Sequence, residues 1–189
     1  PLYFFSINPD QTSFAYQHAL GNTKDLGYLR VDGEDILLTP EADSPHKVSE
    51  AEFWDDRTLY FVTTYGQEFA YIARFDLTGR DFEKVCEVEE HQMHTLRLDQ
   101  ERNLLYFVAS RGVQDRLFVY RLDTQELKEL AAPVPVIIQI EIGKSGKIYL
   151  LGLSAIAPAN LFVGDLDSSW EALTTHRIMG DRKSTRLNS

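Results

Sequence analysis

The chain has 189 residues, of which 43% are apolar, 12% aromatic and 25% charged, and its formal net charge is −10 at pH 7. This apolar content is too high for a disordered acidic chain, and no apolar run approaches the roughly 18 residues of a membrane-spanning helix, so we expect no membrane partner. Acidic residues outnumber basic ones by 29 to 19, which argues against a nucleic-acid partner, because phosphate contacts need clustered lysine and arginine.

The predicted strands form a unit of four that recurs four times along the chain. The first strands are expected to end at four apolar positions: Ile7, Phe53, Leu98 and Ile142. The second strands are expected at residues 13–19, 58–64, 104–110 and 147–153. The third strands are expected to end next to four aspartates: Asp32, Asp76, Asp123 and Asp167. The fourth strands are expected at residues 36–39, 82–85, 126–130 and 170–174.

Equivalent positions in the four units recur at one period of about 45 residues. The apolar residues at one position of the second strands are Phe14, Leu59, Leu105 and Ile148. Turn-forming residues follow each first strand, at 8–11, 55–57, 99–103 and 143–146. No segment keeps an apolar period of 3.6 residues over three turns, whereas period-two alternation and β-branched or aromatic residues are common. The chain is therefore predicted to be all-β.

Four-stranded units with a repeat of 40–50 residues are typical of β-propeller blades. We predict about four antiparallel blades, at roughly 1–44, 45–90, 91–133 and 134–180. Both ends look cut, because the chain opens within a strand, so we expect these blades to belong to a larger seven- or eight-bladed ring. Residues 181–189 (DRKSTRLNS) have no periodicity. They resemble the translation of a sequencing adapter, and we expect them to be a non-native tail.

The sequence offers little catalytic chemistry. A Gly-x-Ser-x-Gly elbow is absent, and residues 143–146 (GKSG) have the wrong spacing and are predicted to be a hairpin turn. One cysteine, Cys86, excludes a disulfide framework and is expected to be a buried structural thiol. The chain also lacks a phosphate-binding glycine loop and a dinucleotide fingerprint. We therefore predict no cofactor and no catalytic residue on this chain.

One cluster has the chemistry of a metal site: His91 and His94, which follow Glu87, Glu89 and Glu90. A catalytic zinc site usually needs three converging ligands, and residues three apart in a strand point to opposite faces. We therefore assign no metal, and we expect the histidines to lie in a solvated loop between blades.

A polar residue lies just before the end of each first strand: Ser6, Glu52, Arg97 and Glu141. If successive blades place these residues side by side, Arg97 falls between two carboxylates. One interpretation is an ion pair between blades, worth little if it is solvated. The other is that the groups face the central channel, where negative charge would favour peptides with a positive amino terminus. We prefer the first interpretation and leave the second open.

Three stretches carry a family resemblance: residues 7–16, with an Asn-Pro-Asp turn before Phe-Ala-Tyr, 115–123 (DRLFVYRLD) and 160–174 (NLFVGDLDSSWEALT). They resemble the propeller of prolyl oligopeptidase family serine peptidases, including dipeptidyl-peptidase-like and acylaminoacyl-peptidase-like enzymes. The resemblance implies a C-terminal α/β-hydrolase domain with a Ser-Asp-His triad as partner, and short peptides as substrates. This chain would then be the gating, substrate-selecting part. Asn8 and Gln11 replace the family's usual Ser and Gly, which leaves the subfamily open.

Two other classes of propeller remain open. One is a non-enzymatic propeller, such as a TolB-like scaffold or another protein-interaction platform. The other is a small-molecule hydrolase with a metal in its channel, for which the sequence offers no identifiable ligand set. A single cysteine and the lack of a visible signal sequence predict a cytoplasmic location.

Overall fold

The computed structural model describes residues 1–167 and 169–177. Blade 1 contains β1 (Leu2–Ile7), β2 (Ser13–Gly21), β3 (Lys24–Val31) and β4 (Glu34–Leu37). Blade 2 contains β5 (Val48–Phe53), β6 (Thr58–Thr63), β7 (Tyr71–Asp76) and β8 (Asp81–Cys86). Blade 3 contains β9 (Gln92–Asp99), β10 (Leu104–Arg111), β11 (Gln114–Arg121) and β12 (Glu126–Leu130). Blade 4 contains β13 (Val136–Ile142), β14 (Ile148–Ser154), β15 (Ala157–Gly164) and β16 (Glu171–Ala172).

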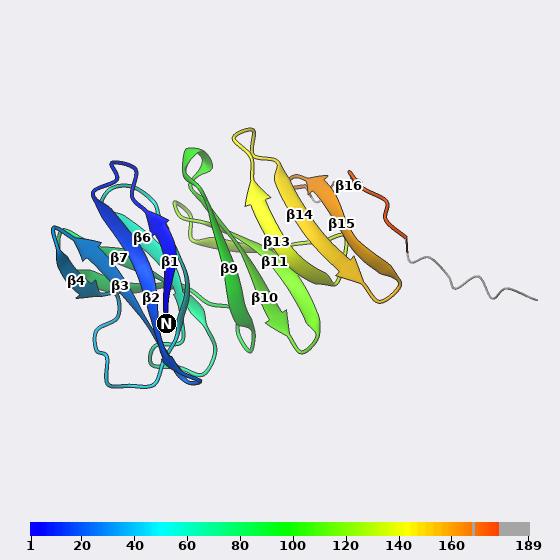
Figure 1. Cartoon of the computed structure of the whole chain (residues 1–189). Helices are drawn as coiled ribbons and strands as arrows, with labels where there is room; N and C mark the ends of the chain where they lie inside the picture. The colour runs from blue at the N-terminus through cyan, green and yellow to red at the C-terminus, as the bar shows by residue number, and fades with distance from the viewer. Residues whose placement is uncertain (168, 178–189) are drawn as a thin grey trace, which may run out of the picture.

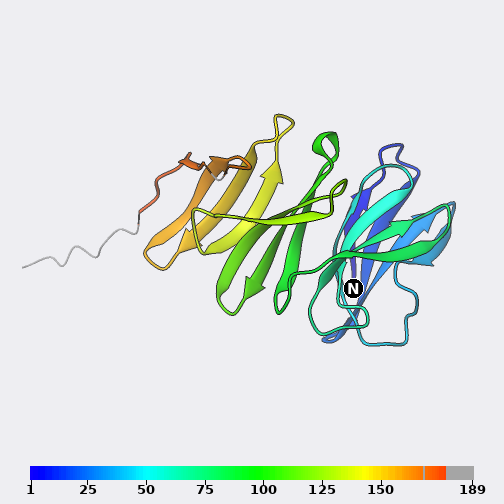
Figure 2. The same ribbon diagram turned by 180° about the vertical axis from the view of Figure 1, so that it is seen from behind.

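Each blade is an antiparallel meander in which strands adjacent in sequence are also adjacent in the sheet. The four sheets succeed one another in chain order (Figure 1), and the view from behind shows the same succession (Figure 2). The first strands of neighbouring blades contact one another, β1 with β5, β5 with β9 and β9 with β13. They form what we call the inner edge. The prediction of an all-β propeller with four four-stranded antiparallel blades is confirmed.

The hydrophobic core consists of three clusters, each between two successive blades. We call the face that packs on the preceding blade the front face, and the face that packs on the next blade the rear face. In β10 of blade 3, Leu105 and Phe107 lie on the front face and pack on blade 2. Tyr106 and Val108 lie on the rear face and pack on blade 4, and all four side chains are fully buried. Because side chains alternate along a strand, a blade buried on both faces needs apolar residues at consecutive positions. This explains the strongly apolar second strands.

Strand ends differ slightly from the predicted ones. The strand β9 runs one residue beyond Leu98, to Asp99, whose carboxylate accepts the Arg102 N–H and caps the short helical turn η1 (Gln100–Arg102). The strand β4 starts two residues early, because Asp32 and Gly33 both adopt positive φ and close a tight hairpin after β3. The predicted turn at 143–146 is confirmed, since the Gly146 N–H donates to the Gly143 carbonyl at 2.8 Å.

The last predicted strand, 170–174, is reduced to the two residues of β16. Trp170 is not part of it, and its indole N–H donates to the Ala131 carbonyl at 2.6 Å. The predicted tail at 181–189 lies outside the described residues. In the part of the chain that the structure describes, no helix is long and apolar enough to cross a membrane.

Candidate functional site

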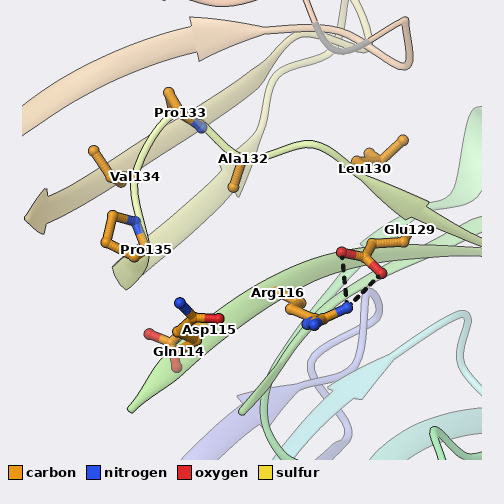
Figure 3. Close-up of a pocket in the computed structure, with 9 residues that line it drawn as sticks. All are labelled: Gln114, Asp115, Arg116, Glu129, Leu130, Ala132, Pro133, Val134 and Pro135. Carbon is orange, nitrogen blue, oxygen red and sulfur yellow. Dashed lines mark hydrogen bonds and ion pairs between the residues drawn. The ribbon is translucent and has the colours of Figure 1, made fainter. Parts of the chain in front are cut away.

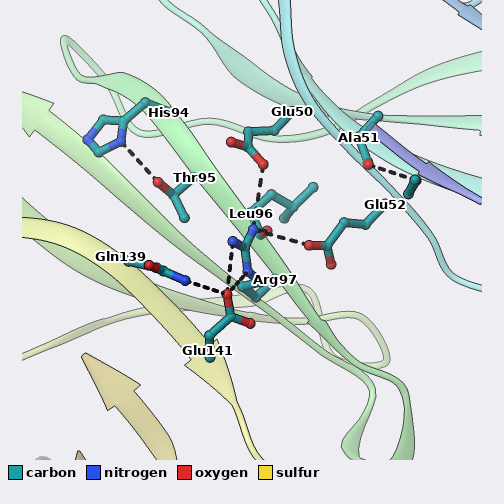
Figure 4. Close-up of polar contacts among 10 residues, drawn as sticks. Glu50, Ala51, Glu52, His94, Thr95, Leu96, Arg97, Gln139 and Glu141 are labelled. Carbon is teal, nitrogen blue, oxygen red and sulfur yellow. Dashed lines mark hydrogen bonds and ion pairs between the residues drawn. The ribbon is translucent and has the colours of Figure 1, made fainter. Parts of the chain in front are cut away.

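A cluster of charged side chains lies at the inner edge and joins blades 2, 3 and 4 (Figure 4). Arg97 of β9 lies at its centre. The Arg97 Nη1 atom is 3.1 Å from Glu52 Oε1 and 3.5 Å from Glu50 Oε2, both carried by β5. The Nη2 atom is 3.2 Å from Glu141 Oε1 of β13. We call Glu50, Glu52, Arg97 and Glu141 the inner-edge cluster.

The sequence placed Arg97 between Glu52 and Glu141, and the structure brings these three side chains together. Sequence reasoning missed Glu50. Residues two apart in a strand point to the same face, so the position of Glu50 two residues before Glu52 could have indicated that both side chains lie near Arg97. Ser6 does not contact Arg97. Its hydroxyl donates to the Ala51 carbonyl at 2.9 Å, so blade 1 is tied to blade 2 through the backbone.

β-Bulges in the first strands explain part of this difference. The ladder shifts at Ser49 in β5, at His94 in β9 and at Ile138 in β13, in each case three residues before the cluster member near the strand end. In β1 the shift falls at Phe5, directly before Ser6. A bulge inserts one residue and re-aims the side chains that follow it. Blade 1 therefore presents its polar residue differently from the other three blades.

The pKa values of the three carboxyl groups in the cluster are shifted in different directions. Burial raises the pKa of Glu52 to about 7, and Arg97 offsets this only in part. Burial also raises the pKa of Glu50. Partial burial pushes the pKa of Glu141 upwards, but hydrogen bonds from Gln139 and Arg97 outweigh it and hold that pKa below its usual value. Near neutral pH the three carboxylates and one guanidinium therefore carry net negative charge, and Glu52 exchanges a proton in that range.

The cluster borders a hollow of about 340 Å³ that is also lined by Phe4, Phe5 and Ala51. The three carboxylates would attract a cation into this hollow. The lining offers no hydroxyl, thiol or imidazole that could act as a nucleophile or base. The arrangement can attract and orient a positively charged group.

The expectation that His91 and His94 lie in a solvated loop between blades was wrong in part, because His91 does lie in the connection between β8 and β9 but is not solvated. His94 lies within β9, at the bulge. His91 is buried just before this strand, where its ring packs edge-on against Phe118 of β11. Phe118 belongs to the apolar cluster between blades 2 and 3, so the His91 ring lies beside that interface. In residues 1–167 and 169–177, no group of three or more histidine, cysteine, aspartate or glutamate side chains could hold a metal ion.

His94 lies close to a serine and an aspartate, which the sequence did not indicate because the three belong to different strands. Its Nε2 atom is 2.9 Å from Ser110 Oγ, and Ser110 donates to Asp115 Oδ1 at 2.6 Å. In a catalytic triad the histidine receives the serine proton and the carboxylate holds the histidine. Here the Asp115 carboxylate accepts a hydrogen bond from the serine, and its other oxygen accepts one from the Ile137 N–H at 2.7 Å. The group ties blade 3 to blade 4.

Two further features lie outside the inner-edge cluster: a cysteine and a second hollow. Cys86 is a buried free thiol at the end of β8, as predicted, and burial raises its pKa to about 12, which disfavours the nucleophilic thiolate. A second hollow, of about 380 Å³, lies between β11, β12 and the connection to β13 (Figure 3). Its ion pair joins Arg116 and Glu129 at 3.1 Å, and both side chains are about half exposed. Neither feature provides a catalytic group.

No protein-family model and no curated protein sequence matches the chain. Solved structures share its fold. A puromycin-hydrolyzing peptidase from Mycobacterium tuberculosis matches with a TM-score of 0.76 and 14% identity, over 94% of this chain and 29% of the peptidase. A prolyl endopeptidase matches with a TM-score of 0.73 and 13% identity, over 89% of this chain and 25% of that chain. TolB from Acinetobacter baumannii matches with a TM-score of 0.69 and 17% identity, over 93% and 44%.

The chain thus covers 25–44% of the length of these three proteins. The likeness shows that the four blades correspond to part of larger propeller-containing proteins, some of them peptidases and some of them TolB proteins. At these identities it establishes the fold.

Proposed function

We propose that this chain is the gating and substrate-selecting propeller of a prolyl-oligopeptidase-type serine peptidase that hydrolyses short peptides. The observation that carries the proposal is the inner-edge cluster, with three carboxylates around Arg97 where the first strands of successive blades contact one another. Its likeness to the propellers of a puromycin-hydrolyzing peptidase and a prolyl endopeptidase supports this assignment. The catalytic serine would belong to a partner α/β-hydrolase domain, since none of the described residues forms a triad.

The charge of the cluster suggests how selection would work. A short peptide carries a positive amino terminus, and the net negative charge at the inner edge would attract it. The attraction between unit charges about 4 Å apart ranges from about 1 kcal/mol in water to about 4 kcal/mol at an effective dielectric constant of 20. Arg97 holds the three carboxylates in place, so little conformational freedom is lost when a cation binds.

Labelling of the intact protein that contains this chain tests the proposal. A fluorophosphonate probe reacts with serines that an adjacent histidine activates. We expect one labelled serine, in a peptide outside residues 1–180, and loss of labelling after heat denaturation. An intact protein that carries no reactive serine would contradict the peptidase assignment.

The second candidate is a non-enzymatic TolB-like or other protein-interaction propeller. The match to TolB, at 17% identity over 93% of this chain, favours it. It predicts no hydrolase domain and no labelled serine, so the same experiment separates the two functions. For the peptidase we further propose a cytoplasmic location, which the single cysteine supports.

A further inference from the structure

Arg74 of β7 departs from the repeat. It pairs with Tyr60 of β6 on the rear face of blade 2, the face that packs on blade 3. The residues at the same position in the other three blades are apolar: Leu29, Val119 and Val163. Leu29 and Val119 are buried against the following blade. Natural proteins break such packing rules mainly at functional sites, so the charge of Arg74 at this position calls for a ligand or a partner.

A hollow of about 340 Å³ lies beside Arg74, between blades 2 and 3. Tyr60, Arg74 and Glu83 form one row across β6, β7 and β8, and Tyr120 of β11 lines the hollow from blade 3. The equivalent position between blades 3 and 4, beside Val119, has a hollow of only about 60 Å³. Both walls belong to blades that pack on each other within this chain, so the hollow is complete without a further blade. We call it the Arg74 hollow.

The Arg74 hollow contains hydrogen-bond donors that the protein does not use. The Nη2 atom of Arg74 is 3.0 Å from Glu83 Oε2, which is the one ion pair of this guanidinium among the described residues. The Arg74 Nε–H is buried and has no hydrogen-bond partner in the part of the chain that the structure describes. The hydroxyls of Tyr60 and Tyr120 also make no hydrogen bond to a described residue. Burial raises the pKa of both tyrosines, so both hydroxyls keep their protons and can donate.

These donors suit an oxyanion. A guanidinium presents parallel N–H groups to a carboxylate or a phosphate, and such charge-assisted hydrogen bonds are short and strong. The charges of Arg74 and Glu83 shift the pKa of Tyr60 in opposite directions, so its hydroxyl lies within electrostatic reach of both groups. The ammonium of Lys84, which also lines the hollow, is already paired with Glu87 at 2.6 Å. Arg74 is therefore the cation that would receive an anion, and Glu83 is its competitor.

We propose that the Arg74 hollow binds a small oxyanion, a carboxylate or a phosphate, with Arg74, Tyr60 and Tyr120 as donors. The anion would replace Glu83 on the guanidinium, and the Glu83 side chain has room to move aside because it is 61% exposed. Binding would give partners to donors that lack them, which removes the penalty of a buried unpaired donor. This inference does not depend on the proposed peptidase function.

Nuclear magnetic resonance of the full chain tests the proposal. The probes are inorganic phosphate and acetate, and sodium chloride at equal ionic strength is the reference. We expect the Arg74 Nε–H signal to move and to saturate with a dissociation constant of about 1 mM, which an anion of four or five non-hydrogen atoms can supply. A response to both probes supports a general oxyanion site, and a response to one of them identifies the oxyanion that the hollow takes.

Four variants locate the site. Arg74→Met should weaken binding at least about tenfold, because it removes the charged donor. Tyr120→Phe, which removes one hydroxyl, should weaken it about threefold. Glu83→Gln removes the competing charge and should tighten binding about twofold to fivefold. The matched control is Arg116→Met, since Arg116 forms a similar ion pair with Glu129 at 3.1 Å on β11 and β12 of blade 3, and it should bind as the wild type does.

Urea unfolding without added anion separates a ligand site from a structural ion pair. Arg74→Met introduces an apolar side chain where the other three blades have one, so it should fold and be no less stable than the wild type. If that variant does not fold, Tyr120→Phe decides. Signals that move equally with chloride would overturn the proposal. So would anion binding that stays at the wild-type value in the folded Arg74→Met or Tyr120→Phe protein.

Discussion

Replacing Arg97 with methionine removes the central charge of the inner-edge cluster and keeps a side chain of similar length. The change leaves Glu50, Glu52 and Glu141 facing one another without the guanidinium that now lies 3.1–3.5 Å from their oxygens. Removing one partner of a fully buried ion pair costs about 3–5 kcal/mol, and an exposed pair is worth about 0–1 kcal/mol. The Arg97 side chain is 22% exposed, so we expect a loss of about 2 kcal/mol at pH 8.

The loss should depend on pH. Because the pKa of Glu52 is raised from 4.5 to about 7, the folded protein binds more protons than the unfolded chain between these values. Its contribution to stability is therefore present at low pH and declines as pH rises through 7. Without Arg97 the carboxylates repel one another at pH 8, and protonation reduces this repulsion at pH 5. We expect the loss to fall below about 1 kcal/mol at pH 5.

Urea unfolding followed by the fluorescence of Trp54 and Trp170 measures both values, at one protein concentration because association shifts apparent stability. The matched control is Arg116→Met. Arg116 pairs with Glu129 across blade 3, and the two side chains are 44% and 47% exposed. This variant should lose less than about 1 kcal/mol at either pH. The reasoning fails if Arg97→Met loses no more than Arg116→Met at pH 8, or loses equally at both pH values.

Three further predictions concern the core. Gly27→Ala should cost about 1–3 kcal/mol, since a Cβ there would lie 2.8 Å from Val48 of blade 2, whereas Gly21→Ala meets nothing within 4 Å and should be nearly neutral. Tyr106→Phe should be neutral or stabilising in urea unfolding, because its buried hydroxyl has no partner among the described residues. Cys86 should react with a thiol reagent only after unfolding. Equal glycine losses, a destabilising Tyr106→Phe or a reactive native thiol would contradict these expectations.

The repeat made most of the fold predictable. Phe14, Leu59 and Leu105 recur at one period, and each pairs with the residue at the equivalent position of the first strand in its own blade, so the meander could be placed from the sequence. Strand ends were less accurate where a local contact decided them. Asp99 extends β9 by capping a helical turn, and Trp170 leaves β16 to reach the Ala131 carbonyl. Such contacts depend on single side chains and leave no periodic signal.

The inner-edge cluster could be predicted only in part. The place of Arg97 between Glu52 and Glu141 follows from repeat equivalence. The bulges at Ser49, His94 and Ile138 cannot be predicted from repeat equivalence, because a shift in the strand register depends on how two strands pair. The burial of His91 was also missed, because it involves packing against Phe118 of β11, which is distant in the sequence.

The most direct test of the central claim is a kinetic measurement on the intact protein. At pH 8, where Glu52 is largely ionised, Glu52→Gln with Glu141→Gln removes about two charges from the inner edge, and Glu129→Gln on the outermost strand of blade 3 is the control. For short peptides with a free amino terminus, the account predicts an increase in KM of about tenfold, equivalent to about 1.4 kcal/mol. It also predicts little change in kcat, and little change in KM for N-acetylated peptides. A KM for the free peptides that stays at the wild-type value would contradict it.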